Sequence, residues 1–200
     1  MLLEVVKLKI ILRFFRSLTF LRWIQIYYRI IYMMVKPSRK VLRTQVNFLQ
    51  VILIAPPKKR VSYSTIGVME SFTFLNRKHT FFQKSVNWSF GGYGMLWTYN
   101  LNYFDWLNQL GMSKELGLET VSQFYATPLE KNPILLHPYP TSLRIINIAK
   151  FISKWNIKED WLYYELISDL KFLSRRLEYH LLANHLLENA FALYIGGLIT

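Results

Sequence analysis

The sequence of 200 residues contains no cysteine, which excludes disulfide bonds and thiolate metal ligands. Long apolar runs are missing from residues 1–35, where Lys and Arg interrupt every candidate window and leave runs of about six residues at most. A secretory signal needs an apolar run of roughly 7–15 residues, and a membrane-spanning helix needs about 20. We therefore expect neither in this segment, which favours a cytoplasmic or membrane-peripheral location.

Acidic residues are scarce at the same end of the chain. Residues 1–60 hold 13 Lys and Arg residues against the single acid Glu4, a net charge of +12. Residues 61–200 hold 12 basic and 11 acidic residues, a net charge of +1. The basic character therefore belongs to the N-terminal segment, in which we predict one or two amphipathic helices and then a linker ending at residues 56–60.

The basic segment can be interpreted in several ways. The favoured one is a helix packed on the domain itself, with its Arg side chains in water. An anionic membrane surface comes next, and an anionic polysaccharide would meet the same charge. Nucleic acid, whose phosphates Lys and Arg also neutralise, is not the expected partner.

The rest of the chain has the spacing of helices. Apolar residues make up 52% of the sequence, enough for a core, and the length suits one domain or one and a half. Closely spaced Phe and Trp between residues 72 and 90 indicate a short strand or an ordered loop. No alternation of strands and helices appears, so we predict a mainly all-α fold with few short strands. The expected antiparallel helices cover residues 95–110, 113–125, 141–155, 159–177 and 178–189. Gly111 is expected to cap the end of the first, and Thr141 or Ser142 the start of the third.

The helix expected at residues 178–189 has an unusual polar side. Leu and Ala fill one half of its helical wheel, and the other half carries His and Asn rather than Lys and Arg. Such a stripe is either a satisfied buried network or a substrate-facing wall, and we favour the wall. His185 and Glu188 could share a metal ion, but no second spaced His pair accompanies them, so no metal is expected. The polar half contains Glu178, His180, Asn184, His185, Glu188 and Asn189.

Two earlier segments combine aromatic and polar side chains. In residues 96–107, Tyr99, Asn102 and Tyr103 share a side that suits a saccharide groove, although aromatic stripes at helical spacing more often form core. Residues 137–147 enter a helix through a rigid Pro-Tyr-Pro sequence and then place Arg144 and Asn147 one turn apart.

These three segments, in this order, resemble the heparinase II/III family of polysaccharide lyases over roughly residues 65–200. Ala183 stands where we would expect Gly, and Ile148 where family members often carry Trp. The resemblance implies a partial α/α toroid, followed in full-length members by a β-sandwich. It also implies an acidic polysaccharide partner, no cofactor and a periplasmic location.

The resemblance further implies cleavage of uronic-acid linkages by β-elimination. The C5 proton becomes removable only when the adjacent carboxylate is neutralised by hydrogen-bond donors, after which a Tyr or His takes the proton. By the family pattern, Asn184 would neutralise the carboxylate and His185 would assist it. The family's catalytic Tyr and a further His follow the matched segments, so we expect no lyase activity from this chain alone. Expected substrate-binding residues are Trp97, Tyr99, Asn102, Tyr103, His137, Tyr139, Arg144, His180 and Glu188.

The sequence also suggests how the chain is divided. We predict a basic segment and linker over residues 1–60, and the N-terminal part of a toroid lyase domain over residues 61–200. No charged residue follows Glu188, and an apolar helix near a terminus needs a partner, so we expect a fragment of a longer protein. The alternative function is a non-catalytic saccharide-binding or surface-polysaccharide assembly protein on the same scaffold.

Overall fold

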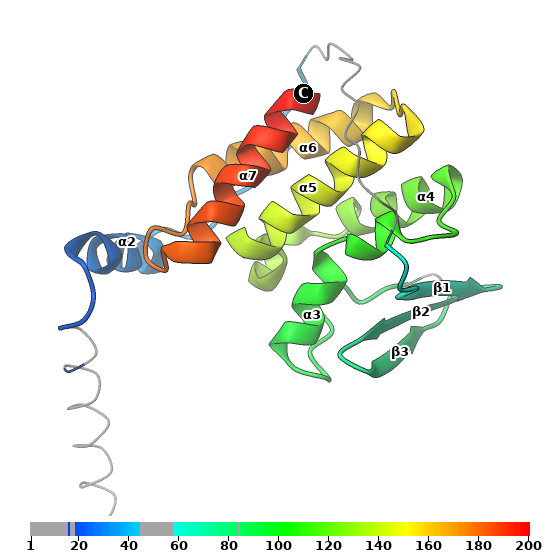
Figure 1. The fold of residues 1–200 in the computed structure, drawn as a ribbon, viewed down its shortest axis with the longest axis horizontal. Helices are drawn as coiled ribbons and strands as arrows, with labels where there is room; N and C mark the ends of the chain where they lie inside the picture. Colours follow the sequence, from blue (N-terminus) through cyan, green and yellow to red (C-terminus); the bar gives the residue numbers. More distant parts are fainter. Residues whose placement is uncertain (1–15, 17–18, 45–57, 84) are drawn as a thin grey trace, which may run out of the picture.

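A computed structural model describes residues 16, 19–44, 58–83 and 85–200 of the chain (Figure 1). These residues form six α-helices, three short 3-10 helices and one small antiparallel sheet. The mainly helical prediction is therefore confirmed, although the described part does not show a toroid. Residues 1–15, 17–18 and 45–57 of the predicted N-terminal segment lie outside the described residues.

The sheet has three strands in the order β1-β2-β3, of which β2 and β3 overlap the aromatic stretch of residues 72–90 and β1 precedes it. β1 spans Tyr63–Ile66, β2 spans Met69–Phe74 and β3 spans Arg77–Phe81. β2 alternates half-buried and buried residues, as expected for a strand that packs one face on a core. The turn between β2 and β3 uses Leu75 and Asn76, which both have positive φ, and this suits the twist of a tight hairpin.

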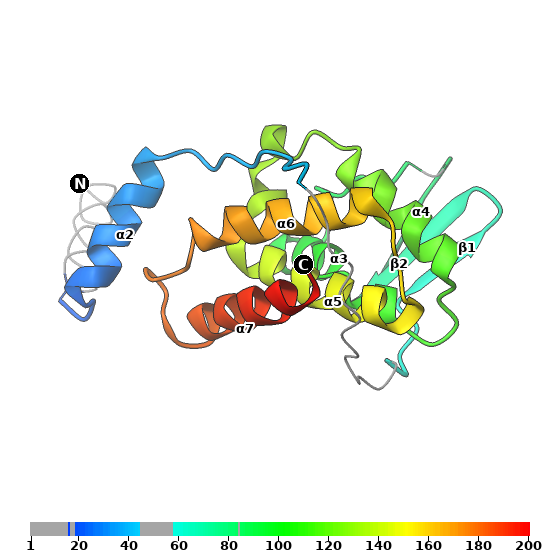
Figure 2. The same ribbon diagram turned by 90° about the horizontal axis from the view of Figure 1, so that it is seen from above.

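The helices form a layered group beside the sheet (Figure 2). α5, α6 and α7 contact one another and run alternately up and down, as predicted for successive antiparallel helices. α3 contacts both β2 and α5, so it joins the sheet to this group. The helical elements are α2 (Trp23–Met34), α3 (Met95–Asn102), η1 (Asp105–Asn108), α4 (Lys114–Tyr125), η2 (Leu129–Lys131), η3 (Pro133–Leu136), α5 (Pro138–Trp155), α6 (Asp160–Ser174) and α7 (Ala183–Ile199).

Two predicted helix boundaries are wrong, and backbone conformation is the reason in both cases. The helix expected from residue 178 begins at Ala183, because Leu182 immediately before it has a φ of 61° and a ψ of −158°, which a right-handed helix cannot contain. The helix expected to reach residue 110 ends at Asn102, because Phe104 has a φ of 58° and a 3-10 turn follows. Gly111 therefore caps no helix.

The predicted limits of the other helices agree more closely with the structure. α4 ends at Tyr125 as predicted, and Ser113 caps its start by accepting a hydrogen bond from the backbone N–H of Leu116 at 3.1 Å. α5 ends at Trp155 as predicted but begins at Pro138, since proline suits the first helical position. Thr141 and Ser142 therefore lie inside α5 and cap nothing. α6 ends at Ser174, three residues before the predicted end.

The core lies where the sheet, α3 and α4 meet. Trp97, Trp106, Phe104 and Phe124 are fully buried, and Phe104 packs edge to face on Phe124 with ring centroids 5.0 Å apart. Aromatic rings favour this arrangement over a direct face-to-face sandwich. The aromatic stripe of residues 97–106 is therefore mostly core, and its polar members are held against that core.

Candidate functional site

A pocket of about 450 Å³ lies among α2, the start of α5, the end of α6 and the turn at residues 178–182. It brings together five of the predicted site residues: Tyr99, His137, Tyr139, His180 and His185. They come from all three of the sequence segments singled out above. The complete lining is Tyr32, Pro37, Tyr99, Pro133, Leu136, His137, Pro138, Tyr139, Phe172, Arg176, Glu178, His180, Leu181 and His185.

Tyr99 and His137 form the closest polar pair in the pocket. The hydroxyl of Tyr99, on α3, lies 2.5 Å from Nδ1 of His137, the residue that precedes α5. Burial raises the pKa of Tyr99, helped by the nearby charge of Glu178, and burial lowers the pKa of His137. Both groups are therefore neutral at pH 7, and the phenol can donate to the imidazole. Such a pair can orient a sugar hydroxyl or relay a proton.

Glu178, His185 and Asn189 form a second polar group that fixes the turn onto α7. The fully buried Asn189 donates from Nδ2 to Glu178 Oε2 at 3.1 Å and accepts from the Glu178 N–H at 2.7 Å. His185 Nδ1 lies 3.3 Å from Glu178 Oε1. Burial raises the pKa of Glu178, although Asn189 and His185 act in the opposite direction. Asn189 thus belongs to a buried network and His185 lines the pocket, while a substrate-facing role for the stripe stays a prediction.

α2 completes the pocket, which the sequence did not predict. The Tyr32 hydroxyl donates to the carbonyl of Leu177 at 2.7 Å, and the Arg176 guanidinium lies 5.0 Å from the Tyr32 ring centroid. Arg176 also donates to the carbonyl of Val35. Burial raises the pKa of Tyr32 to about 12, and burial with the charge of Arg29 lowers the pKa of His180. No sequence motif identifies Tyr32, because its place in the pocket depends on how α2 packs against the turn that follows α6.

Two predicted residues have their side-chain N–H groups bonded inside the fold, and a third lies beside the pocket. Trp97 Nε1 donates to the carbonyl of Arg77 at 3.0 Å, and Asn102 Nδ2 donates to the carbonyl of Trp88 at 2.9 Å. Tyr103 is half-buried, with its ring 6.0 Å from that of Tyr139, and burial raises its pKa. Substrate contact by these residues stays a prediction.

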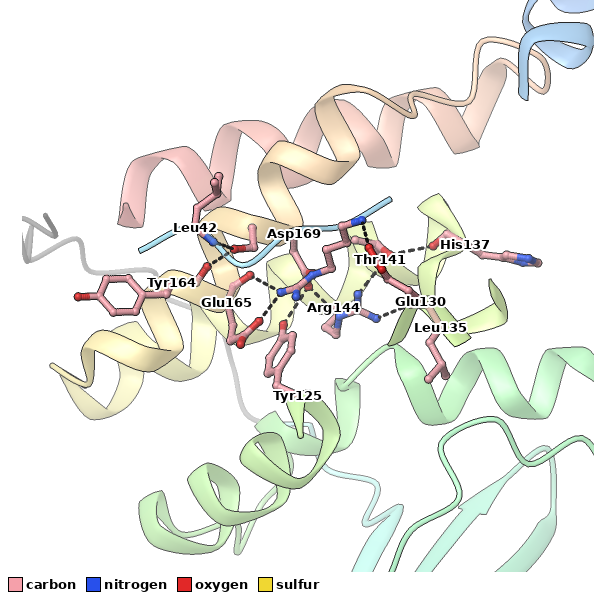
Figure 3. A network of polar contacts seen from close by, with 12 residues as sticks. Leu42, Tyr125, Glu130, Leu135, His137, Thr141, Arg144, Tyr164, Glu165 and Asp169 are labelled. Atoms are coloured by element: carbon pink, nitrogen blue, oxygen red, sulfur yellow. Dashed lines mark hydrogen bonds and ion pairs between the residues drawn. The ribbon is translucent and has the colours of Figure 1, made fainter. Parts of the chain in front are cut away.

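Arg144 lies in a buried ionic network rather than in the pocket (Figure 3). Its Nε donates to Asp169 Oδ2 at 2.9 Å, and the hydroxyl of Tyr125 donates to the same oxygen at 2.8 Å. Arg39, from the segment after α2, donates to the other carboxylate oxygen at 2.5 Å and also pairs with Glu165. The Arg144 side chain is fully buried, so Arg144 occupies a structural position.

Asn184 and His185, the predicted catalytic pair, lie in different places, one outside the pocket and one in its lining. His185 lines the pocket, and its ring lies 4.6 Å from that of Tyr139. Asn184 is exposed at the start of α7 and is not among the lining residues. Glu188 is half-buried one turn further along α7. The pKa of Tyr139 is raised mainly by burial, and the negative charge of Glu188 raises it further. A catalytic role for Asn184 and His185 stays a prediction.

The pocket therefore contains aromatic rings with hydrogen-bonding groups, together with charged groups of both signs. Arg176 supplies a guanidinium, Glu178 a carboxyl group, and three histidines an imidazole each. In the part of the chain that the structure describes, no group of three or more His, Cys, Asp or Glu residues could hold a metal ion. None of the described helices combines the length and apolar content needed to cross a bilayer.

Comparison of the chain with protein-family models, with curated proteins and with solved structures finds no match.

Proposed function

We propose that this chain is the N-terminal helical part of a heparinase II/III-like lyase, and that its pocket belongs to a groove for uronic-acid-containing polysaccharide. One observation carries the proposal. Each of the three segments that resemble the family contributes to the same pocket, through Tyr99, Tyr139 and His185 respectively. Segments chosen from sequence for a shared chemistry are thus neighbours in space. In this proposal α3 to α7 form part of an α/α toroid.

The lining groups suit an acidic saccharide. Tyrosine rings pack on sugar faces, while phenol and imidazole groups bind hydroxyls. Arg176 supplies a cation for a uronate carboxylate, and an arginine fork matches a carboxylate in geometry. In the proposed β-elimination, Asn184 and His185 would neutralise the carboxylate next to C5, which stabilises the enolate-like intermediate.

Binding is the direct test. We expect uronic-acid oligosaccharides, titrated calorimetrically into the chain, to bind more tightly than neutral glucan oligosaccharides of equal length. Tyr139→Ala should weaken binding roughly tenfold, because one aromatic sugar contact is lost. Tyr194→Ala is the matched control, since Tyr194 is 67% exposed on α7 and does not line the pocket. Equal affinity for neutral and acidic sugars, or equal losses in both variants, would contradict the proposal.

Turnover is a separate test. We expect the chain alone to release no unsaturated uronate, followed by its ultraviolet absorbance, because the family's catalytic Tyr and further His have no match in the segments that resemble the family. In a longer version that contains them, Asn184→Ala should lower the rate by orders of magnitude, roughly 10²-fold or more for a lost carboxylate-stabilising donor, with the fold retained. Near-normal turnover by that variant would refute the role of Asn184.

A non-catalytic saccharide-binding protein is the second candidate function. The observation that favours it is the position of Asn184, which is exposed outside the pocket, whereas Tyr99, His137 and Tyr139 line it. Tight uronan binding that persists in the longer version without any turnover would select this candidate over the lyase.

A further inference from the structure

α2 presents its polar side to the protein and its apolar side to solvent. The Gln25 amide donates to the carbonyl of His180 at 3.3 Å, Tyr28 stacks on Tyr179 with ring centroids 4.6 Å apart, and Tyr32 bonds to Leu177 as described above. These three residues share one side of the helix. A surface helix of a water-soluble domain ordinarily has the reverse orientation.

The outward side is a continuous apolar surface. Trp23, Tyr27, Ile30 and Met34 recur at intervals of three or four residues, and all are exposed, Trp23 to 85% and Met34 to 79%. No residue of α2 is buried. Figures 1 and 2 both place α2 at the end of the molecule opposite the sheet.

Positive charge borders this apolar surface. Arg29 lies on α2, Arg22 and Lys36 lie just beyond its two ends, and all three are exposed. Among the described residues up to position 44 there is no Asp or Glu to offset them. An apolar stripe containing Trp and bordered by cations is the pattern of a helix that lies in a lipid interface.

We propose that α2 binds an anionic membrane surface through Trp23, Tyr27, Ile30 and Met34, with Arg22, Arg29 and Lys36 at the lipid headgroups. Charge complementarity selects this occupant. A second copy of the chain joined through the same side would bring two cationic helices together, and like charges oppose such a contact. A lipid interface instead accepts the indole ring and the cations together, since Trp places its apolar body in the acyl region and its N–H at the headgroups.

Membrane attachment in this form would orient the pocket. Tyr32 lines the pocket from the side of α2 that faces away from the lipid. The pocket would therefore lie about one helix diameter, roughly 10 Å, above the headgroups and open to a water-borne ligand. This inference does not depend on what the pocket binds.

Vesicle binding by the full chain tests the proposal. We expect co-sedimentation with phosphatidylcholine vesicles containing phosphatidylglycerol, and little with phosphatidylcholine alone. Trp23 is the most exposed of the six tryptophans, so its emission should shift to the blue on binding. Trp23→Ser should weaken partitioning roughly tenfold or more, whereas Trp23→Phe should keep most of the binding and lose the spectral shift.

Control variants separate the alternatives. Phe82→Ser removes an aromatic side chain that is 65% exposed at the sheet end of the molecule, and it should leave partitioning unchanged. The proposal is overturned if the chain ignores anionic vesicles, or if Arg22→Gln with Arg29→Gln abolishes binding while Trp23→Ser does not, which would indicate charge attraction alone. It is also overturned if sedimentation velocity shows a dimer that Trp23→Ser dissociates.

Discussion

Ala183 begins α7 with a φ of 46°, in the left-handed region that costs a residue with a β-carbon roughly 1–2 kcal/mol. Leu182 before it has a φ of 61°, so two consecutive residues adopt this conformation. The bonds between Glu178 and Asn189 hold the turn closed and offset the strain. The strain thus lies next to the pocket residues His180 and His185.

Glycine at position 183 should stabilise the protein. Ala183→Gly removes the β-carbon that the backbone angle disfavours, so we expect the free energy of unfolding in urea to rise by about 0.5–1 kcal/mol. Ala190→Gly is the matched control, because Ala190 is exposed within α7 and glycine there should cost about 1 kcal/mol. Equal destabilisation by both variants would show that Ala183 is not strained in solution.

Protonation of His137 and His180 should couple to the binding of an acidic saccharide. Burial lowers the pKa of both, so both are neutral at pH 7, and an anion favours their charged forms. Glu178, whose pKa is raised by burial, also loses its negative charge as the pH falls. We expect the dissociation constant for a uronate oligosaccharide to fall as the pH decreases from 7 to 5, and His180→Asn to reduce that slope. A pH-independent constant would contradict this.

At the scale of elements, α7 packs closely on α5 and α6 through Gly196. A β-carbon at position 196 would lie 2.7 Å from atoms of both Ile145 and Leu170, whereas one at position 197 would have nothing within 4 Å. Two adjacent glycines of one helix therefore face entirely different surroundings. The first allows the helices to approach, and the second is open to water.

Alanine at these two positions should have opposite effects. Gly196→Ala should lower the free energy of unfolding by about 1–2 kcal/mol through overpacking, even after the gain in helix propensity. Gly197→Ala should raise it by up to about 1 kcal/mol, because alanine is the better helix former. Thermal unfolding followed by circular dichroism measures both. Stabilisation by Gly196→Ala would mean that the three helices are more loosely packed than the structure indicates.

Local signals in the sequence predicted some elements and missed others for identifiable reasons. The extent of α4 and the end of α5 at Trp155 were predicted, since helical spacing depends on neighbouring residues. The start of α7 was missed because helical periodicity continues through residues 178–182. The bonds that hold that turn reach Asn189, and periodicity carries no information about them.

At the scale of the molecule, the buried carboxylate of Asp169 joins four segments of the chain. It accepts hydrogen bonds from Arg39 before the linker, Tyr125 of α4 and Arg144 of α5, and it belongs to α6. Burial acts to raise the pKa of Asp169, but the two arginines outweigh it and the pKa is lowered. The segment that follows α2 is thereby tied to the helical group.

Removing this charge should destabilise the whole fold. Asp169→Asn leaves two buried guanidinium groups without their shared carboxylate, so we expect a loss of about 3 kcal/mol in urea unfolding at pH 7. Because the pKa is lowered, the stabilisation is present above the unfolded-state value of about 3.9 and is lost as the pH falls through the folded-state value. The difference between the two proteins should therefore shrink below pH 4.

An exposed aspartate provides the comparison. Asp160→Asn, at the first position of α6, should cost only about 0.5 kcal/mol through the helix dipole. If Asp169→Asn costs no more than this, Asp169 does not organise the fold.

The candidate site could be predicted from sequence only in part. The motifs that contain Tyr99, His137 and His185 were recognisable as segments, and the structure brings these residues to one pocket. Tyr32 and Arg176 could not be found in this way, because their contact depends on how α2 packs against a turn 145 residues away. The pairing of Arg144 with Asp169 could not be predicted either, since an arginine in a helix gives no sign of a buried carboxylate from another helix, and substrate contact by Arg144 stays a prediction.

Three of the bonds that hold α2 in place use main-chain carbonyls, those of Leu177, His180 and Val35. A carbonyl is present whatever the side chain, so substitution at position 177 or 180 leaves its acceptor unchanged. His180 can thus be replaced to alter what the pocket recognises while the helix beside it stays attached. Tyr32 and Arg176, by contrast, both hold the helix and line the pocket, so their substitution would change docking and recognition together.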